Sequence, residues 1–272
     1  MTLNNSDGMY SHPTPNGAVL YHWQGGLLLL AETLVLTRPM KAIASTLRIA
    51  LENPYTIEVE DSSLVTRASF TGSKRVRKKV IAEQSFLALF YIPLEQPEYL
   101  GLRHWLGDQA IVNLDIDIFE PVLPRLREAF AGNMSAVDVK QLMLDTTRLI
   151  SSSETELANL DPRIFKACEI LQKTCLDDFN ITDIANAVHL SPSRLRELFR
   201  NQIGHSIGDY ARWAAIWQAV GHWKRGVSFT EAAADAGFYD LAHLSKAFIE
   251  VFGMPASLLA DVPQVKIICC DE

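Results

Sequence analysis

Long hydrophobic runs are absent from this 272-residue sequence, which excludes a membrane-spanning helix. The longest apolar run near the N-terminus covers residues 27–31 and is interrupted at once by Glu32. Residues 1–17 are polar and have no cationic start before an apolar stretch, so they do not resemble a secretory signal. We therefore expect a protein that stays in the cytoplasm and has no membrane partner.

Cysteine is scarce: the four residues form no Cys-x-x-Cys or Cys/His spacing of the kind that binds zinc. Cys168 and Cys175 lie seven positions apart, on one helical face, and we interpret them as small apolar core residues. Cys269 and Cys270 are adjacent near a polar end, where we expect a loose tail. A redox switch at this second pair is the alternative.

Histidine is scarce as well, and none occurs between His22 and His104. The strand-rich part of the chain therefore lacks the cluster of histidine and carboxylate ligands that a metal-dependent barrel enzyme would need. We interpret these two histidines as ordinary core or surface residues. No Ser/His/Asp or glycine-rich phosphate motif is apparent either. We predict a protein that is not an enzyme and holds no metal or cofactor; the competing class is a cupin-type enzyme with a helical accessory region.

The composition suits two globular domains. Apolar residues make up 48% of the chain, charged residues 21% and aromatic residues 9%, which argues against long disorder. Residues 26–93 contain short apolar and β-branched runs separated by turn signals, as in a small barrel or sandwich. Residues 97–150 change to a helical period. We predict an N-terminal domain at residues 1–150 and, from the polar break that follows, a linker at residues 151–160.

Two similar helix-turn-helix segments occupy the C-terminal third, at residues 181–204 and 229–253. Each one closes on the pattern Leu-x-x-x-Phe-x-x-x-x-Gly. The copies lie 49 positions apart and match at Leu195, Phe199 and Gly204 against Leu244, Phe248 and Gly253. A duplicated helix-turn-helix indicates DNA as the partner. We assign residues 161–260 to this DNA-binding domain and residues 261–272 to an acidic C-terminal tail.

The second helix of the first unit has the chemistry of a recognition helix. Ser191 is a typical N-cap and Pro192 a typical first helical residue. Apolar residues at helical spacing face the core, which leaves these polar residues outside: Ser193, Arg194, Arg196, Glu197 and Arg200. An arginine fork can pair with a guanine edge or with phosphate oxygens. The alternative is a solvated surface helix whose arginines pair with Glu197.

Residues 164–259 resemble the AraC/XylS-type transcription regulators. The resemblance rests on motifs in this order: Ala185, Leu190-Ser191-Pro192-Ser193-Arg194-Leu195, Phe199, Gly204, Tyr210, Gly237-Phe238, His243, Phe248 and Phe252-Gly253-x-Pro255. A lone helix-turn-helix match would be weak, whereas this series covers about a third of the chain.

The resemblance implies a long central helix at residues 207–224 that holds both recognition helices on one side of the DNA. Its apolar side would form the core between the two units, with Trp213, Ile216, Trp217, Val220 and Trp223. Carried over by position, the base-facing residues of the first unit are Ser193, Arg196 and Glu197, and those nearer to phosphate are Arg194 and Arg200.

In the second unit the resemblance assigns DNA contacts to Leu241, Ala242, His243 and Lys246, with Asp240 as the N-cap of their helix. Leu241 and Ala242 stand where polar side chains are usual in the family. Small apolar groups can meet a thymine methyl group but cannot hydrogen-bond a base edge. We therefore expect the first unit to supply most of the sequence discrimination and the second unit mainly to position the protein.

For the whole chain, the resemblance implies an α+β protein: a cupin-like β-barrel with following helices that senses and dimerises, then an all-α domain of two helix-turn-helix units joined by a long helix. The implied function is a transcription regulator, favoured as an activator that binds promoter DNA and RNA polymerase and responds to a small-molecule effector of unknown identity. Control by a protein partner is the alternative. Residues 162–260 carry ten Lys/Arg and ten Asp/Glu, so weak monomer binding favours a homodimer.

The strongest charge cluster is basic and comprises Lys74, Arg75, Arg77, Lys78 and Lys79. We favour a solvated hairpin for this cluster. The two alternatives are an anionic effector site and an additional phosphate contact.

Overall fold

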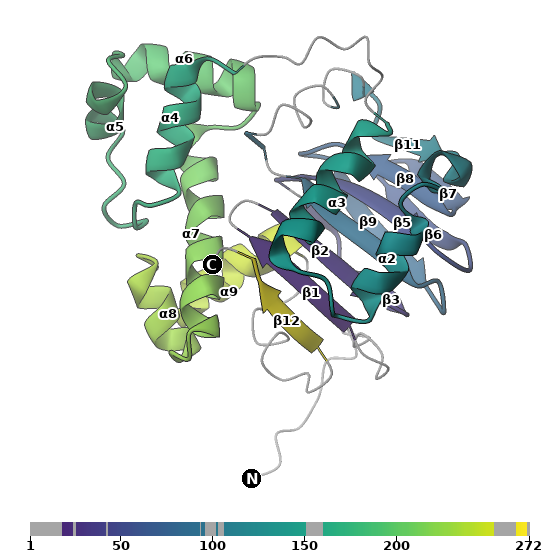
Figure 1. The fold of residues 1–272 in the computed structure, drawn as a ribbon. Helices are drawn as coiled ribbons and strands as arrows, with labels where there is room; N and C mark the ends of the chain where they lie inside the picture. Colours follow the sequence, from purple (N-terminus) through teal and green to yellow (C-terminus); the bar gives the residue numbers. More distant parts are fainter. Residues whose placement is uncertain are drawn as a thin grey trace.

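In the computed structural model, the described residues are 18–23, 26–41, 43–92, 94–95, 102, 106–150, 160–252 and 265–270. The N-terminal part consists of two β-sheets and short helices, and the C-terminal part is helical (Figure 1). The predicted α+β class is confirmed. His104, Gly253 and Pro255 lie outside the described residues. No helix in these ranges combines the length and the apolar character that crossing a membrane requires.

The larger sheet has seven strands, antiparallel except at one edge. Its order is β11 (Ile111–Leu114), β8 (Ala68–Thr71), β5 (Ser45–Ala50), β10 (Leu87–Ile92), β2 (Gly26–Ala31), β1 (Ala18–Trp23) and β12 (Val265–Cys269). The smaller sheet has the order β3 (Leu34–Leu36), β9 (Val76–Ala82), β6 (Tyr55–Val59) and β7 (Ser62–Thr66), with β4 (Met40–Lys41) also paired to β9. Across the described strands these are two open sheets, so the predicted barrel is not closed by backbone pairing.

The seven-stranded sheet is buried on both faces, and for this reason its central strands are nearly all apolar. Successive side chains alternate between the faces. Leu47 and Ile49 of β5 face a core shared with α2 (Leu123–Phe130) and α3 (Ala136–Arg148). Leu87 and Leu89 of β10 belong to the core that the small sheet covers. A 3-10 helix, η1 (Ile116–Phe119), precedes α2.

The C-terminal tail differs from the sequence-based expectation. Val265–Cys269 form β12, which pairs in parallel with β1. Cys270 is buried, and its backbone nitrogen donates to the His22 carbonyl oxygen at 2.8 Å. The expectation of a loose tail is therefore wrong for residues 265–270. The pairing is between the two ends of the chain, so no local sequence signal reports it.

The C-terminal domain begins with α4 (Pro162–Leu171), where Asp161 caps the helix and Pro162 is its first residue. The first helix-turn-helix unit is α5 (Ile181–Ala187) and α6 (Pro192–Ile203), and the second is α8 (Phe229–Asp235) and α9 (Leu241–Phe252). The long helix α7 (Ile207–Lys224) joins them and runs from one unit to the other in Figure 1. Its bounds are those predicted from the sequence.

The tryptophans of α7 have a wider role than the predicted one. Trp213 and Trp217 are buried and pack on Phe252 of α9, at ring-centroid distances of 6.0 and 5.5 Å. They also contact the sheet domain: Trp213 stacks on Tyr91 at 6.4 Å, and Trp217 stacks on His22 at 5.9 Å. These two residues therefore form core between the sheets and the second helix-turn-helix unit.

Candidate nucleic-acid interface

Helix α6 is held by caps at both ends. The Ser191 hydroxyl oxygen accepts from the Arg194 backbone nitrogen at 3.3 Å, as the N-cap pattern predicts. Gly204 ends the helix in the left-handed region, with a φ of 85°, and its nitrogen donates to the Arg200 carbonyl oxygen. Leu195 and Phe199 are buried. The rotation of the helix about its axis is thus fixed by its apolar face.

The opposite face of α6 is exposed along its whole length. All five residues predicted to contact DNA are exposed there, namely Ser193, Arg194, Arg196, Glu197 and Arg200. Arg194 pairs with Glu197 at 2.8 Å, which matches the alternative of a self-paired surface helix for this one arginine. Arg196 and Arg200 have no carboxylate partner among the described residues. Their guanidinium groups are therefore available to a ligand.

Arg196 and Arg200 line a surface groove together with Glu197. The other wall comes from residues at the start of α5 and α7: Phe179, Ile181, Ser206, Ile207 and Gly208. Residues four apart on a helix lie on one side, so the two arginines face the groove together. A negatively charged backbone passing over α6 would meet both guanidinium groups.

Helix α9 offers fewer polar groups. Asp240 is its N-cap, as predicted, and its carboxylate accepts from the His243 backbone nitrogen at 2.7 Å. Ala242, His243 and Lys246 are exposed, but Leu241 is half-buried against the core. The His243 ring packs edge-on against Phe238 at 5.2 Å. Lys246 is consequently the one exposed cation among the four residues assigned to DNA here.

Tyr239 is a candidate contact that the sequence interpretation missed. It lies in the turn immediately before Asp240 and its side chain is 93% exposed, whereas the neighbouring Phe238 is buried. An exposed aromatic residue beside the start of a recognition helix can pack on sugar or donate a hydroxyl to phosphate. The available signal was its place between the Gly237-Phe238 motif and the N-cap.

The two units begin differently. Ser228 and Glu231 form a full capping box at α8, with the Ser228 nitrogen donating to Glu231 at 2.9 Å. At α5, Asn180 and Asp183 stand at the spacing of a similar box. The Asn180 side chain instead accepts from the Thr182 nitrogen at 2.9 Å, a simpler cap. Aspartate is one methylene shorter than the glutamate that reaches back in the box.

The loop after α4 joins the first unit to the second. The Leu176 nitrogen donates to the Ala236 carbonyl oxygen at 3.0 Å, and the Cys175 thiol donates to the Asp235 carbonyl oxygen at 3.3 Å. Gly237 has a φ of 80°, and a Cβ there would lie 2.5 Å from the Asp177 nitrogen. This junction therefore requires glycine at position 237.

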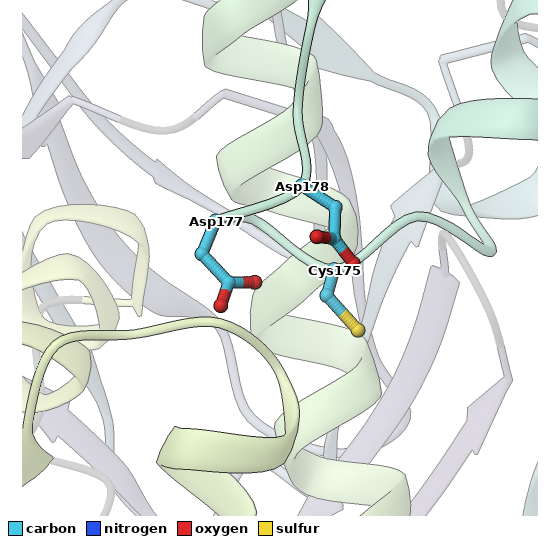
Figure 2. A group of neighbouring side chains, drawn as sticks. All are labelled: Cys175, Asp177 and Asp178. Atoms are coloured by element: carbon cyan, nitrogen blue, oxygen red, sulfur yellow. The ribbon is translucent and has the colours of Figure 1, made fainter.

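Figure 2 shows Cys175, Asp177 and Asp178 side by side in the same loop, where their ligand atoms lie within 4.8 Å of one another. Burial and then the neighbouring carboxylates raise the pKa of the Cys175 thiol. A raised pKa disfavours the thiolate that a metal would bind. We assign the cluster to the junction between the two units. Cys175 is also only partly buried, unlike the core position that its spacing from Cys168 predicted.

A buried polar network connects the sheet domain to the first unit. Glu95 is 6% exposed; one of its carboxylate oxygens accepts from Gln172 of α4 at 2.8 Å and the other from the Tyr210 hydroxyl of α7 at 3.0 Å. Gln172 also donates to the Tyr210 hydroxyl at 3.0 Å. Burial raises the pKa of Glu95, and the two side-chain hydrogen bonds oppose this change.

The basic cluster on the sheets divides into two parts. Three members pair with acidic residues: Arg75 with Glu60 at 3.5 Å, Lys78 with Asp61 at 3.4 Å, and Lys79 with Glu58 at 3.7 Å. Lys74 is exposed. Arg77 is buried, which contradicts the solvated hairpin for this residue because β9 directs its side chain inward.

Comparisons with known proteins agree with this geometry. Residues 184–260 match a family model described as a helix-turn-helix domain. The arabinose operon regulatory proteins of Escherichia coli K12 and Salmonella typhimurium LT2 are each 31% identical over 139 residues; the matches cover 49% of this chain and 44% and 46% of those proteins. The chain thus spans less than half the length of these relatives.

Solved structures extend the likeness to the sheet domain. The crystal structure of ToxT from Vibrio cholerae O395 covers 84% of this chain and 97% of its own, at a TM-score of 0.51 and 12% identity. Another ToxT structure reaches a TM-score of 0.56 at 11% identity over 88% of this chain. The fold is therefore that of a sheet domain joined to a tandem helix-turn-helix domain. Residues 184–260 are thus similar to a helix-turn-helix domain, and the likeness to the arabinose operon regulatory proteins agrees with the resemblance recognised from the motifs.

Proposed function

We propose that this protein is a sequence-specific DNA-binding transcription regulator. The observation that carries the proposal is the exposed, capped helix α6, which α7 connects to the second unit and its helix α9. Two of its arginines, Arg196 and Arg200, have no carboxylate partner in the part of the chain that the structure describes. Phosphate contacts position such a helix and base contacts specify the sequence. The function of the whole chain is a proposal, because the curated relatives match this chain over less than half of their own length.

Within the first unit, Ser193, Arg196 and Glu197 contact base edges, while Arg194 and Arg200 contact phosphate. Arg200 lies one turn beyond Arg196 along the same groove, farther from the N-terminal part of the helix, whose residues contact base edges in this motif. In the second unit, His243 and Lys246 supply the polar contacts and Ala242 an apolar one. Leu241 contributes less, because it is half-buried.

The sheet domain senses a small-molecule effector and regulates DNA binding. A ToxT structure of the same fold is described as bound to an unsaturated fatty acid, and another as bound to a substituted butenoic acid. Control by a protein partner is the second form of this proposal. We further propose a cytoplasmic homodimer that activates transcription through RNA polymerase; a second copy would double the contacts of a domain whose charges cancel.

The proposal is tested by selecting bound sequences from a promoter library with the full chain, and then measuring Kd on a selected site at 50 and 200 mM salt. Arg196→Ala is compared with Lys166→Ala, which removes one exposed charge from α4 away from the groove. Specific, salt-sensitive binding that only Arg196→Ala impairs is expected. Equal binding to selected and scrambled sites would contradict the proposal and reopen the enzyme class.

A further inference from the structure

Two arginines are buried between the sheets. Arg48 of β5 is 2% exposed and Arg77 of β9 is 3% exposed. Arginine is almost never this buried unless a carboxylate or another anion pairs with it. Neither arginine has a salt bridge to an Asp or Glu in the described part of the chain.

The strand geometry directs both side chains to the same interior. Leu47 and Ile49 of β5 face α2 and α3, so the intervening Arg48 points to the opposite face, toward the small sheet. In β9 the pairing with β6 shifts by one residue between Glu58 and Val59. Such a bulge reverses which side chains face inward. As a result Arg77 shares the inner face with Val80, three positions later.

Most of the hydrogen-bonding capacity of these two guanidinium groups is unused. One Arg48 Nη donates to the Thr71 hydroxyl at 2.9 Å. Among the described residues, the buried Nε of Arg48 and the buried Nε and one Nη of Arg77 have no hydrogen-bond partner. A buried donor without an acceptor costs about 1–3 kcal/mol, and more when it is charged. Three such donors in one interior are typical of a site shaped for something other than the stability of the fold.

Hydroxyl groups lie among the apolar side chains of this interior. The Tyr55 hydroxyl of β6 bonds the Ser69 hydroxyl of β8 at 2.6 Å, across the two sheets. Burial lowers the pKa of Arg77 to about 10; the neighbouring Tyr91 opposes this change and the charge of Arg48 adds to it. Arg77 therefore stays protonated at neutral pH. Burial also lowers the pKa of Arg48, but an arginine side chain keeps its charge in proteins. Two like charges face one interior, and nearby tyrosine hydroxyls are available as further donors.

We propose that Arg48 and Arg77 form a binding site for a small oxyanion, a carboxylate or a phosphate group, between the two sheets. Guanidinium groups match the planar, bidentate geometry of such anions. The site deepens the proposed function and rests on it, because the anion would be the effector. Tyr91 provides the connection: it lies beside both arginines, and its ring contacts Trp213 of α7 and Phe252 of α9. Binding of an anion between the two arginines would therefore change the contacts of Tyr91 with the second helix-turn-helix unit.

The first experiment measures thermal unfolding of the full chain with 20 mM acetate, succinate or inorganic phosphate, at ionic strength matched with sodium chloride. We expect at least one anion to raise Tm by roughly 5 °C, as saturating ligand does. The acetate and succinate arms against the phosphate arm distinguish the carboxylate from the phosphate source. Arg77→Met and Arg48→Met should each abolish the shift. If no anion raises the wild-type Tm more than that of Arg77→Met, the proposal is overturned.

The second experiment needs no ligand. If the arginines serve binding, replacing a buried charge by an apolar side chain of similar length should leave the ligand-free Tm unchanged or raise it by a few degrees. Arg67→Met is the matched control, because the Arg67 guanidinium donates to the carbonyl oxygens of Ala50 and Leu51 at 3.4 and 2.7 Å. This control should lower Tm. A fall in Arg77→Met as large as in Arg67→Met would assign the arginines to the fold and overturn the site.

The two proposals fail in different ways. Anion binding is measured without DNA. If no anion raises Tm but the protein binds specific DNA, only the proposal of the oxyanion site is wrong. If the anion still raises Tm but the protein does not bind specific DNA, the regulator proposal is wrong, and the oxyanion site serves another function.

Discussion

The two recognition helices, α6 and α9, have the same length but different neighbours. Helix α6 buries Leu195 and Phe199 within its own unit and presents a row of polar residues away from the sheets. Helix α9 buries its apolar side partly against the sheet domain, where Phe252 meets Tyr91 at 5.5 Å. Of the two helices, α9 is therefore the one that packs directly on the sheet domain.

A division of labour follows from this comparison. The Glu95 network connects the first unit to the sheets at the end of α4 and at Tyr210 of α7. Helix α6, which carries the arginines, takes no part in this network. The unit with few polar contacts has its recognition helix at the domain interface. We therefore expect the first unit to hold DNA and discriminate between sequences, and the second to engage or release it as the sheet domain changes.

The largest effect is expected from breaking the interface of the second unit. Trp213→Ala removes a side chain that is 1% exposed between Tyr91 and Phe252. The free energy of unfolding of this variant, measured by urea denaturation and circular dichroism, should be lower than that of the wild type by about 3–5 kcal/mol. Trp223→Ala is the control, because Trp223 is half-buried and stacks only on Phe229 within the second unit. Equal losses in the two variants would contradict a shared core with the sheets.

The next effect tests which unit discriminates. Arg196→Ala should weaken binding to the selected site by about 1–3 kcal/mol and relax the preference at one base position. Lys246→Ala should weaken binding to all sequences alike and reduce the salt dependence by about one counterion. Titrations of both variants on matched and scrambled sites measure the contrast. The proposed ordering is wrong if Arg196→Ala leaves binding intact while Lys246→Ala abolishes it.

A smaller effect compares the caps of the two units. Ser191→Ala removes one hydrogen bond at α6 and should cost about 1 kcal/mol of stability. Ser228→Ala removes a reciprocal capping box at α8 and should cost somewhat more. Ser193→Ala serves as the control, because it removes the contact between the Ser193 and Ser191 hydroxyls at 3.1 Å but leaves the N-cap bond to the Arg194 nitrogen. Chemical denaturation of the three variants gives the order, and a reversed order would show that α8 is held by packing alone.

The helices of the C-terminal domain could be predicted from the sequence because their signals are local. Ser191 and Pro192 mark the start of α6, Gly204 marks its end, and the apolar spacing fixes its buried face. The α7 bounds were instead implied by the family resemblance, and the helix has those bounds in the structure. Because the apolar spacing fixes the buried face of α6, it also predicted that the assigned DNA contacts on this helix would be exposed. Whether they contact DNA as assigned stays a prediction.

The features that escaped prediction depend on contacts distant in sequence. Arg77 looked like part of a solvated basic hairpin, and only the bulge between β6 and β9 turns it inward. Arg48 stood unnoticed in an apolar strand, since its burial depends on the small sheet above it. The pairing of β12 with β1 joins opposite ends of the chain. None of these has a periodic or capping signal.

The smallest expected effect concerns the tie between the sheets and the first unit. The folded-state pKa of Glu95 is raised above its ordinary value of 4.5, chiefly by burial. Its contribution to stability is therefore complete below pH 4.5 and is lost as pH rises through the raised folded-state value. Glu95→Gln keeps an acceptor for Gln172 or Tyr210 and does not titrate. The Tm of the wild type, relative to that of the variant, should fall as pH rises above 4.5. If the difference in Tm between the wild type and Glu95→Gln stays constant as pH rises above 4.5, ionisation of Glu95 does not govern the contact between the sheets and the first unit.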